Sequence, residues 1–320
     1  MDMLTGILKA LIMGIIDSLK GTIALFYLDK NIKECVDQQS PQKNKKSNGP
    51  PNRKTSHAAQ TLKKQEEPKV LRRTLQCCLL NGGVFWLSIV VFEYVLLPAL
   101  RSVLYLMFGH NPNTGLSVWG WMEPFLQWTF GTFWVLPLFL LSKVVNALWF
   151  QDIADSAFRY SRGTPQQFSS VSKLVADTLF SVLVQAFFLA QTMLVSLLPI
   201  PVLAELMSLV HMCLLYSLYS FEYKWCNMGW ELHRRLTYIE NNWPYFVGFG
   251  LPMAVFTGWP HSYIISGCVF SILFPLFIIS GNEANPVTDV CDSRLKLFSP
   301  VITISNTLLN RTIGSQSVSR

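Results

Sequence analysis

The sequence predicts an all-α polytopic membrane protein with about six apolar helical arms, some of which can be re-entrant hairpins, and with amphipathic interfacial helices beside them. Of the 320 residues, 51% are hydrophobic and only 14% are charged, and the mean hydropathy is positive. Residues 243–281 contain no Asp, Glu, Lys or Arg. A straight helix of that length would run almost twice the roughly 30 Å thickness of the hydrocarbon core. This stretch must therefore fold back on itself inside lipid.

The first 28 residues are predicted to form an amphipathic helix that lies in the membrane interface. Charged residues such as Asp17 and Lys20 fall mostly on the side opposite to the apolar ones, and Lys suits a helix at the headgroups. A helix of a soluble core is the alternative. Residues 37–69 disfavour it, because their Lys, Gln, Asn, Ser and Pro predict a disordered basic linker that offers no core. The apolar positions at helical spacing are Leu4, Leu8, Leu11, Ile15, Leu19, Ile23 and Phe26.

A multi-span membrane domain is predicted for residues 70–284. Its first arm covers residues 79–100 and closes near Pro98, since proline cannot continue the helical hydrogen bonds. The second arm covers residues 124–141 and has several tryptophans on its entry side, as in an interfacial aromatic belt. Residues 149–158 then keep apolar residues on one helical face, which predicts a second amphipathic surface helix.

The remaining four arms form two predicted hairpins. Residues 174–198 and 202–221 are joined by a Pro-Ile-Pro sequence that leaves room only for a tight turn. Residues 243–256 and 262–281 are separated by a short segment that contains Gly and Pro, which permit a turn and stop a helix. Residues 243–256 are short for a full crossing, so a re-entrant hairpin stays open.

Polar residues inside the arms are the candidate functional positions. Ionisable groups at membrane depth are costly and suggest a pathway or a partner. The alternative, which we favour, is that Asp177 and Glu205 reach headgroups from the helix ends, while Gln185 and Gln191 bond neighbouring helices. The complete set is Glu93, Asp177, Gln185, Gln191, Glu205 and His211.

No catalytic, cofactor-binding or metal-binding motif stands out, so the sequence favours a protein that is not an enzyme and needs no cofactor. His211 and Cys213 could suggest acyl transfer. A lone histidine in a membrane helix more often bonds across a helix pair, because a nucleophile also needs a third, orienting group. Cys77 and Cys78 follow two arginines at the predicted membrane border and are candidates for lipidation, with helix packing as the alternative.

The net charge of +7 is interpreted as orienting the chain and touching membrane lipids, and it carries no prediction of nucleic-acid binding. Twelve Lys and Arg residues between positions 29 and 73 predict that this side faces the cytosol. Lys224, Arg234 and Arg235 mark a later cytosolic loop. Alternation through six arms then predicts that both termini are cytosolic, with residues 285–320 as a cytosolic tail.

Four runs of sequence resemble a known family. They are NGGVFW at 81–86, VLPLFLLSKVVNALWFQDIAD at 135–155, LLYSLYSFEYKW at 214–225 and SYIISGCVFSILFPLFIISGNEA at 262–284. With them, residues 70–284 closely resemble the etoposide-induced protein 2.4 family of endoplasmic-reticulum membrane proteins. The linker and the tail match less clearly.

The resemblance implies a role in autophagy, in autophagosome formation or clearance, with links to growth suppression and apoptosis that include binding Bcl-2-type proteins. The superfamily is also distantly similar to bacterial CysZ sulfate-uptake proteins, whose folds combine long spans with hairpins that only partly enter the bilayer. A sulfate-like anion channel or carrier is therefore the alternative function.

Overall fold

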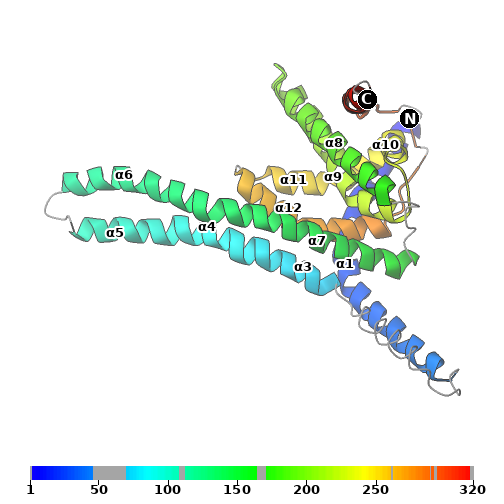
Figure 1. Cartoon of the computed structure of the whole chain (residues 1–320), viewed down its shortest axis with the longest axis horizontal. Helices are drawn as coiled ribbons and strands as arrows, with labels where there is room; N and C mark the ends of the chain where they lie inside the picture. Colours follow the sequence, from blue (N-terminus) through cyan, green and yellow to red (C-terminus); the bar gives the residue numbers. More distant parts are fainter. Residues whose placement is uncertain are drawn as a thin grey trace.

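The computed structural model describes residues 2–45, 70–107, 112–163, 171–260, 262–288, 290–291 and 294–317, and in these ranges helices are the regular secondary structure. Five of the described helices are long and apolar enough to cross a membrane, which confirms the all-α polytopic class. They are Val70–Met107, Val118–Arg159, Ala176–Ser196, Pro201–Asn227 and Tyr263–Glu283. Figure 1 shows a long helical hairpin that extends well beyond a bundle formed by the other helices.

The long hairpin has two nearly continuous limbs. The first comprises α3 (Val70–Cys78), η1 (Leu79–Trp86), α4 (Leu87–Val91), η2 (Phe92–Leu96) and α5 (Leu97–Met107), and the second comprises α6 (Pro112–Phe130), η3 (Gly131–Val135) and α7 (Leu136–Arg162). Their apolar spans of 38 and 42 residues would each measure roughly 60 Å, about twice the hydrocarbon thickness. Both limbs therefore extend beyond the predicted arms at residues 79–100 and 124–141.

The predicted separate surface helix at residues 149–158 is wrong as an element, because these residues continue α7 without a break. Its predicted faces are confirmed: Phe150, Ile153 and Ala157 are buried, while Asp152 is exposed. No Gly or Pro lies between Lys143 and the end of the helix at Arg162, so the change from an all-apolar to an amphipathic pattern marks where α7 begins to pack on other helices.

Prolines lie within both limbs and do not end them, and two of them follow π-helical segments. The π-helical segments η2 and η3 begin six residues before Pro98 and Pro137 respectively. Proline offers no N–H to the carbonyl four residues earlier and its ring crowds that carbonyl, so the helix widens locally to π geometry. The expectation that the first arm closes near Pro98 is therefore wrong.

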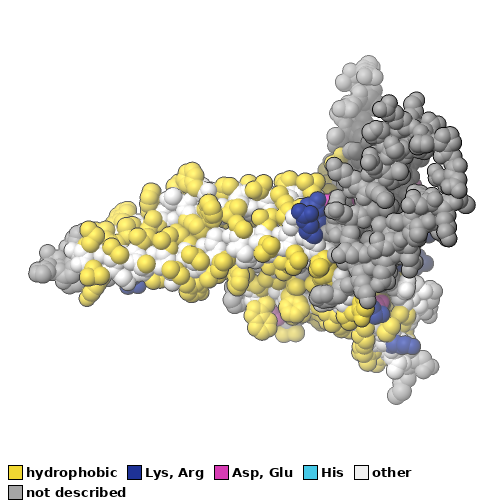
Figure 2. Space-filling view, turned by 90° about the horizontal axis from the view of Figure 1, so that it is seen from below, with side chains coloured by type: hydrophobic (Ala, Val, Ile, Leu, Met, Phe, Trp, Pro, Cys, Tyr) yellow, Lys and Arg dark blue, Asp and Glu magenta, His cyan; other side chains and the backbone are white. Residues whose placement is uncertain are grey.

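The outer part of the hairpin is covered with apolar side chains. Leu106 and Trp121 are 82% and 86% exposed, and Figure 2 shows hydrophobic side chains along almost the whole projecting arm. Where the limbs meet the bundle, the buried amides of Asn81 and Asn146 donate to each other's Oδ1 at 3.1 Å in both directions. An apolar surface of this kind is suited to contact with lipid. The Asn81–Asn146 amide pair holds the two limbs together at the base of the hairpin.

The two predicted hairpins of the bundle are confirmed. Helices α8 (Val171–Ser196) and α9 (Pro201–Asn227) are joined by a turn at residues 197–200, and α10 (Leu232–Asn241) follows. Helices α11 (Trp243–Gly258) and α12 (Tyr263–Glu283) are separated at residues 259–262. The 16 residues of α11 would span only about 24 Å, which is too short for a full crossing. The described residues thus contain five possible spans and one short arm, which together are the six apolar arms expected.

Two of the basic residues expected in a cytosolic loop are buried. Arg235 belongs to the polar cluster described below, and Lys224 Nζ donates to the carbonyls of Gly281 at 3.1 Å and Ala284 at 2.7 Å. The last carbonyls of a helix have no partner within it, so a buried ammonium group stabilises the end of α12 there. Lys224 thus caps a helix, and the side of the membrane on which it lies stays a prediction.

Helix α1 (Asp2–Lys45) packs closely on α11 and α12. Its buried face carries small residues: an added Cβ at Gly14 would collide with the backbone of Tyr245, and one at Gly21 with the backbone of Leu276. Asp17, expected on the polar outer face, is instead 3% exposed and accepts a hydrogen bond of 2.7 Å from the Tyr245 hydroxyl.

The expectation that the N-terminal helix finds no core is therefore wrong, because α11 and α12 supply one from more than two hundred residues away. The apolar residues predicted to face the interface, such as Leu4 and Ile23, are exposed, and their contact with the bilayer stays a prediction. Helix α1 also continues through residues 37–45, which were assigned to the linker and include several straight-chain helix formers. The rest of the linker, at 46–69, lies outside the described residues.

The C-terminal segment packs on the bundle. The backbone N–H of Phe298 donates to Glu240 Oε1 at 2.9 Å, and the Phe298 ring is fully buried. Burial raises the pKa of the Glu240 carboxyl, although the backbone N–H groups of Phe298 and Ser299 act in the opposite direction. Helix α13 (Ser299–Ser317) then lies against α8.

Candidate functional site

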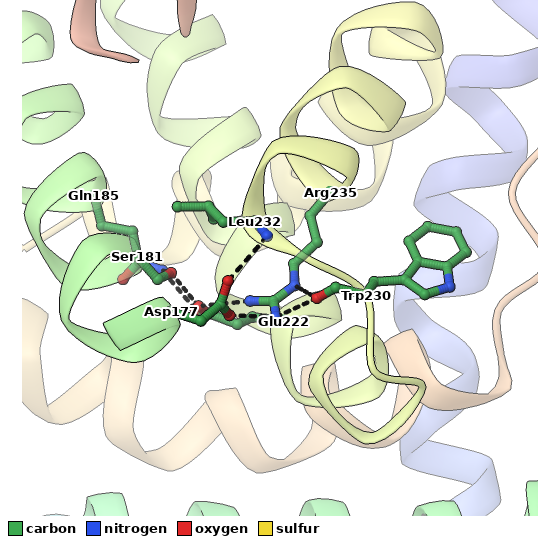
Figure 3. Close-up of polar contacts among 7 residues, drawn as sticks. All are labelled: Asp177, Ser181, Gln185, Glu222, Trp230, Leu232 and Arg235. Carbon is green, nitrogen blue, oxygen red and sulfur yellow. Dashed lines mark hydrogen bonds and ion pairs between the residues drawn. The ribbon is translucent and has the colours of Figure 1, made fainter. Parts of the chain in front are cut away.

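A buried ion pair links α8 to α10 (Figure 3). Arg235 Nη2 lies 2.7 Å from Asp177 Oδ2, and the Arg235 side chain is 0% exposed. The other carboxylate oxygen of Asp177 accepts a 3.1 Å hydrogen bond from the backbone N–H of Leu232, at the start of α10. Arg235 Nε also donates to the Trp230 carbonyl at 2.9 Å. The pair therefore fixes both the start and the orientation of α10.

Glu222 of α9 completes this cluster. Its carboxylate accepts hydrogen bonds from Ser181 Oγ and Gln185 Nε2 of α8, and Arg235 Nη1 lies 3.6 Å from its Oε1. Figure 3 shows the side chains of three helices converging on this point. One guanidinium is shared by two carboxylates, and two neutral donors stabilise the second of them. The geometry suits a clamp that holds α8, α9 and α10 together.

The structure brings Asp177 and Gln185 together, whereas sequence reasoning missed Ser181, Glu222 and Arg235. The sequence does contain a signal for part of this cluster, because polar residues recur along one helical face of each helix. They occupy positions 177, 181 and 185 on α8 and positions 205, 208, 219 and 222 on α9. Gln185 does bond a neighbouring helix through Glu222.

Gln191 and His211 form a second polar site, at the C-terminal segment. His211 Nδ1 lies 2.7 Å from the Met207 carbonyl, which can only accept, so Nδ1 carries the proton and Nε2 accepts from Gln191 Nε2 at 3.0 Å. Gln191 Nε2 also donates to the Leu297 carbonyl at 3.2 Å. These contacts use the His211 ring to fix neighbouring elements and leave neither nitrogen to activate Cys213.

An aromatic stack continues this second site. The Phe188 ring stacks between His211 and Phe298, with centroids 5.2 Å and 4.2 Å apart. Together with the Gln191 hydrogen bond, the stack seats the C-terminal segment against the middle of the α8–α9 hairpin.

The other predicted positions stand apart from both sites. Glu93 is exposed on the long hairpin, and Glu205 is exposed near the start of α9. Cys77 is fully buried and Cys78 is partly exposed, so only Cys78 is accessible for lipidation, which stays a prediction. Within the described ranges, no group of three or more His, Cys, Asp or Glu side chains could hold a metal ion.

Two adjoining cavities, which we call the polar groove, lie beside α9. The larger has a volume of about 820 Å³ and the smaller of about 210 Å³, and Lys143, Tyr219 and Phe270 line both. The larger reaches Glu205, and the smaller reaches Glu222. Helices α9 and α12 line both cavities, together with residues of α7 and α8, and α11 also lines the larger one.

Comparison with known proteins places this architecture in a family. The family model described as "Sulfate transporter CysZ/Etoposide-induced protein 2.4" matches residues 58–278. No solved structure was found to match the chain.

Three curated relatives are similar. The Ectopic P granules protein 4 of Caenorhabditis elegans is 38% identical over 151 residues, which are 47% of this chain and about half, 48%, of that relative's length. The Protein EI24 homolog of Arabidopsis thaliana is 28% identical over 68% of this chain and 76% of its own. The Protein EI24 homolog of Dictyostelium discoideum is 28% identical over 68% of this chain and 67% of its own. The matched region covers most of the membrane domain, and the chain therefore belongs to the CysZ and etoposide-induced protein 2.4 family.

Proposed function

We propose that this chain is a non-enzymatic, multi-pass protein of the endoplasmic-reticulum membrane that supports the formation or clearance of autophagosomes. Family membership over residues 58–278 is the observation that carries the proposal, because the family is associated with autophagy. Growth-suppressive and apoptosis-linked roles, with binding of Bcl-2-type proteins, belong to the same proposal, as do cytosolic positions for both termini.

The geometry supports a role without catalysis. The hydrogen-bonding groups of Asp177, Arg235 and His211 contact neighbouring helices or backbone carbonyls, and they are not arranged as a nucleophile beside a base. Such contacts suit a membrane scaffold whose surfaces are held in fixed positions.

Cells that lack the native protein provide the first test. Autophagic flux should fall when the protein is absent. It should return when the full chain is expressed, because the missing protein is then the only difference between the two cell lines. The rescuing protein should fractionate with the endoplasmic reticulum, and Asn310 of the Asn-Arg-Thr sequon should stay unglycosylated on a cytosolic tail. Unchanged flux would contradict the role, and an endoglycosidase-sensitive mobility shift that is lost in Asn310→Gln would contradict the orientation.

A sulfate-like anion channel is the second candidate, since the matched family model names a sulfate transporter and the polar groove could hold an anion. The charges argue against it: Lys143 shares the groove with Glu205, and Glu222 is already paired with Arg235, so the groove carries no net positive charge to select a free divalent anion. Liposomes that contain the purified chain should therefore take up labelled sulfate no faster than protein-free liposomes. Saturable uptake that Lys143→Met abolishes would establish the channel instead.

A further inference from the structure

The polar groove holds two charged side chains without counter-charges from the protein. Lys143 of α7 and Glu205 of α9 both line the larger cavity, and neither belongs to an ion pair among the described residues. Lys143 Nζ lies 5.0 Å from the centre of the Phe139 ring. Unpaired charges in membrane-spanning helices are costly unless something satisfies them. The groove therefore offers one cation and one anion to whatever occupies it.

The groove lies where a lipid headgroup could enter. The larger cavity is lined by Ser196 and Glu205, which flank the turn between α8 and α9, and by Gly258 and Tyr263, which flank the turn between α11 and α12. The turn between α8 and α9 joins two helices long enough to cross the membrane, so the end of the cavity at this turn is within reach of the headgroup layer.

Apolar residues complete the lining. Leu189 of α8 and Met212 of α9 line the same cavity as Lys143 and Glu205. Leu189 is exposed, so acyl chains could lie against this side of the groove. Its volume of about 820 Å³ falls within the roughly 300–1,000 Å³ of small-molecule sites.

We propose that the polar groove binds the headgroup of a zwitterionic phospholipid, with the phosphate at Lys143 and the ammonium group at Glu205. A lysine ammonium is a strong partner for phosphate, and a carboxylate is one for a quaternary or primary ammonium group. At the inner end of the groove, Gln185 donates to Glu222, and Glu222 lies 3.6 Å from Arg235, so these groups already have partners in the protein. This inference does not depend on the role in autophagy.

Native mass spectrometry of the purified full chain in detergent tests the proposal. The chain would be titrated with phosphatidylcholine, phosphatidylethanolamine and phosphatidic acid, the last of which has no ammonium group. Lys143→Met should weaken all three by about tenfold, because each loses the phosphate contact, whereas Lys143→Arg should restore binding. Glu205→Gln should weaken phosphatidylcholine and phosphatidylethanolamine but should not weaken phosphatidic acid, whose anionic headgroup loses a repelling carboxylate. Glu93→Gln and Arg101→Gln, exposed on the long hairpin, are the matched controls.

Two results would overturn the proposal. Equal lipid affinities in the wild type and in all groove variants would show that neither charge contacts a headgroup. Inorganic phosphate that displaces the lipids, and whose own binding needs Lys143 but not Glu205, would assign the site to a free anion.

A second measurement on the wild-type chain does not depend on the folding of a variant. Phosphatidylcholine that carries a photoreactive group on its headgroup should crosslink to peptides that contain residues 196–219 or 257–270. Crosslinks confined to the long hairpin would place the lipid elsewhere and refute the site. Autophagic flux is measured in cells, so failure of either proposal leaves the other separately testable.

Discussion

Arg235→Met should destabilise the protein by about 3–5 kcal/mol, because the partly buried carboxylates of Asp177 and Glu222 would lose the fully buried guanidinium that they share. For a chain of this size the expected fall in melting temperature is roughly 10 °C. Thermal unfolding in detergent, followed by intrinsic fluorescence, measures the change. Abundance in cells should fall in parallel, since a larger unfolded fraction is degraded.

The neighbouring arginine supplies the matched control. The Arg234 guanidinium lies 4.1 Å from the centre of the Trp230 ring on an exposed surface, so Arg234→Met should cost only about 0.5–1 kcal/mol. Adding Asp177→Asn to Arg235→Met should recover part of the loss, because one of the two unpaired negative charges disappears. If Arg235→Met and Arg234→Met have the same melting temperature, the ion cluster does not clamp the helices.

Gly250→Ala should separate α11 from α9. A Cβ at this position would overlap the carbonyl oxygen of Cys213, which belongs to the backbone and cannot rotate away as a side chain could. One of the two helices must shift, at an expected cost of about 3 kcal/mol or more, since overpacking in a close-packed interior displaces the backbone. The same thermal unfolding experiment measures it, and Gly248→Ala should act similarly because its Cβ would meet the backbone of Leu11 of α1.

Helix α11 also contains the control for this substitution. A Cβ at Gly258 would have no neighbouring heavy atom within 4 Å, so Gly258→Ala should leave the melting temperature unchanged or raise it slightly, because alanine favours a helix more than glycine does. Equal losses from Gly250→Ala and Gly258→Ala would show that helix packing at Cys213 is not the cause.

The membrane class, the arms and their turns could be predicted from the sequence because lipid selects for local properties. A long apolar stretch must be helical in a bilayer, and Pro with Gly or a Pro-Ile-Pro sequence breaks it at a readable position. The breaks after Ser196 and after Gly258 accordingly match the prediction. Pro98 did not, since a proline can either end a membrane helix or widen it into a π turn, and the neighbouring packing decides which.

Only the tertiary structure decided which helices meet and which polar groups become partners. Asp17 and Tyr245 are separated by 228 residues, and Asp177 and Arg235 by 58, so no local pattern links either pair. The face of α1 that packs on α11 carries Gly14 and other small residues, and two backbones can approach closely only where side chains are small. A search for apolar periodicity ranks this face as the weaker one, because small residues add little hydrophobicity. The sequence by itself thus determined what must lie in lipid, because burial in lipid depends on each segment's own composition. Partners depend on two distant segments having complementary shapes and charges, and that appears only when both are placed in space.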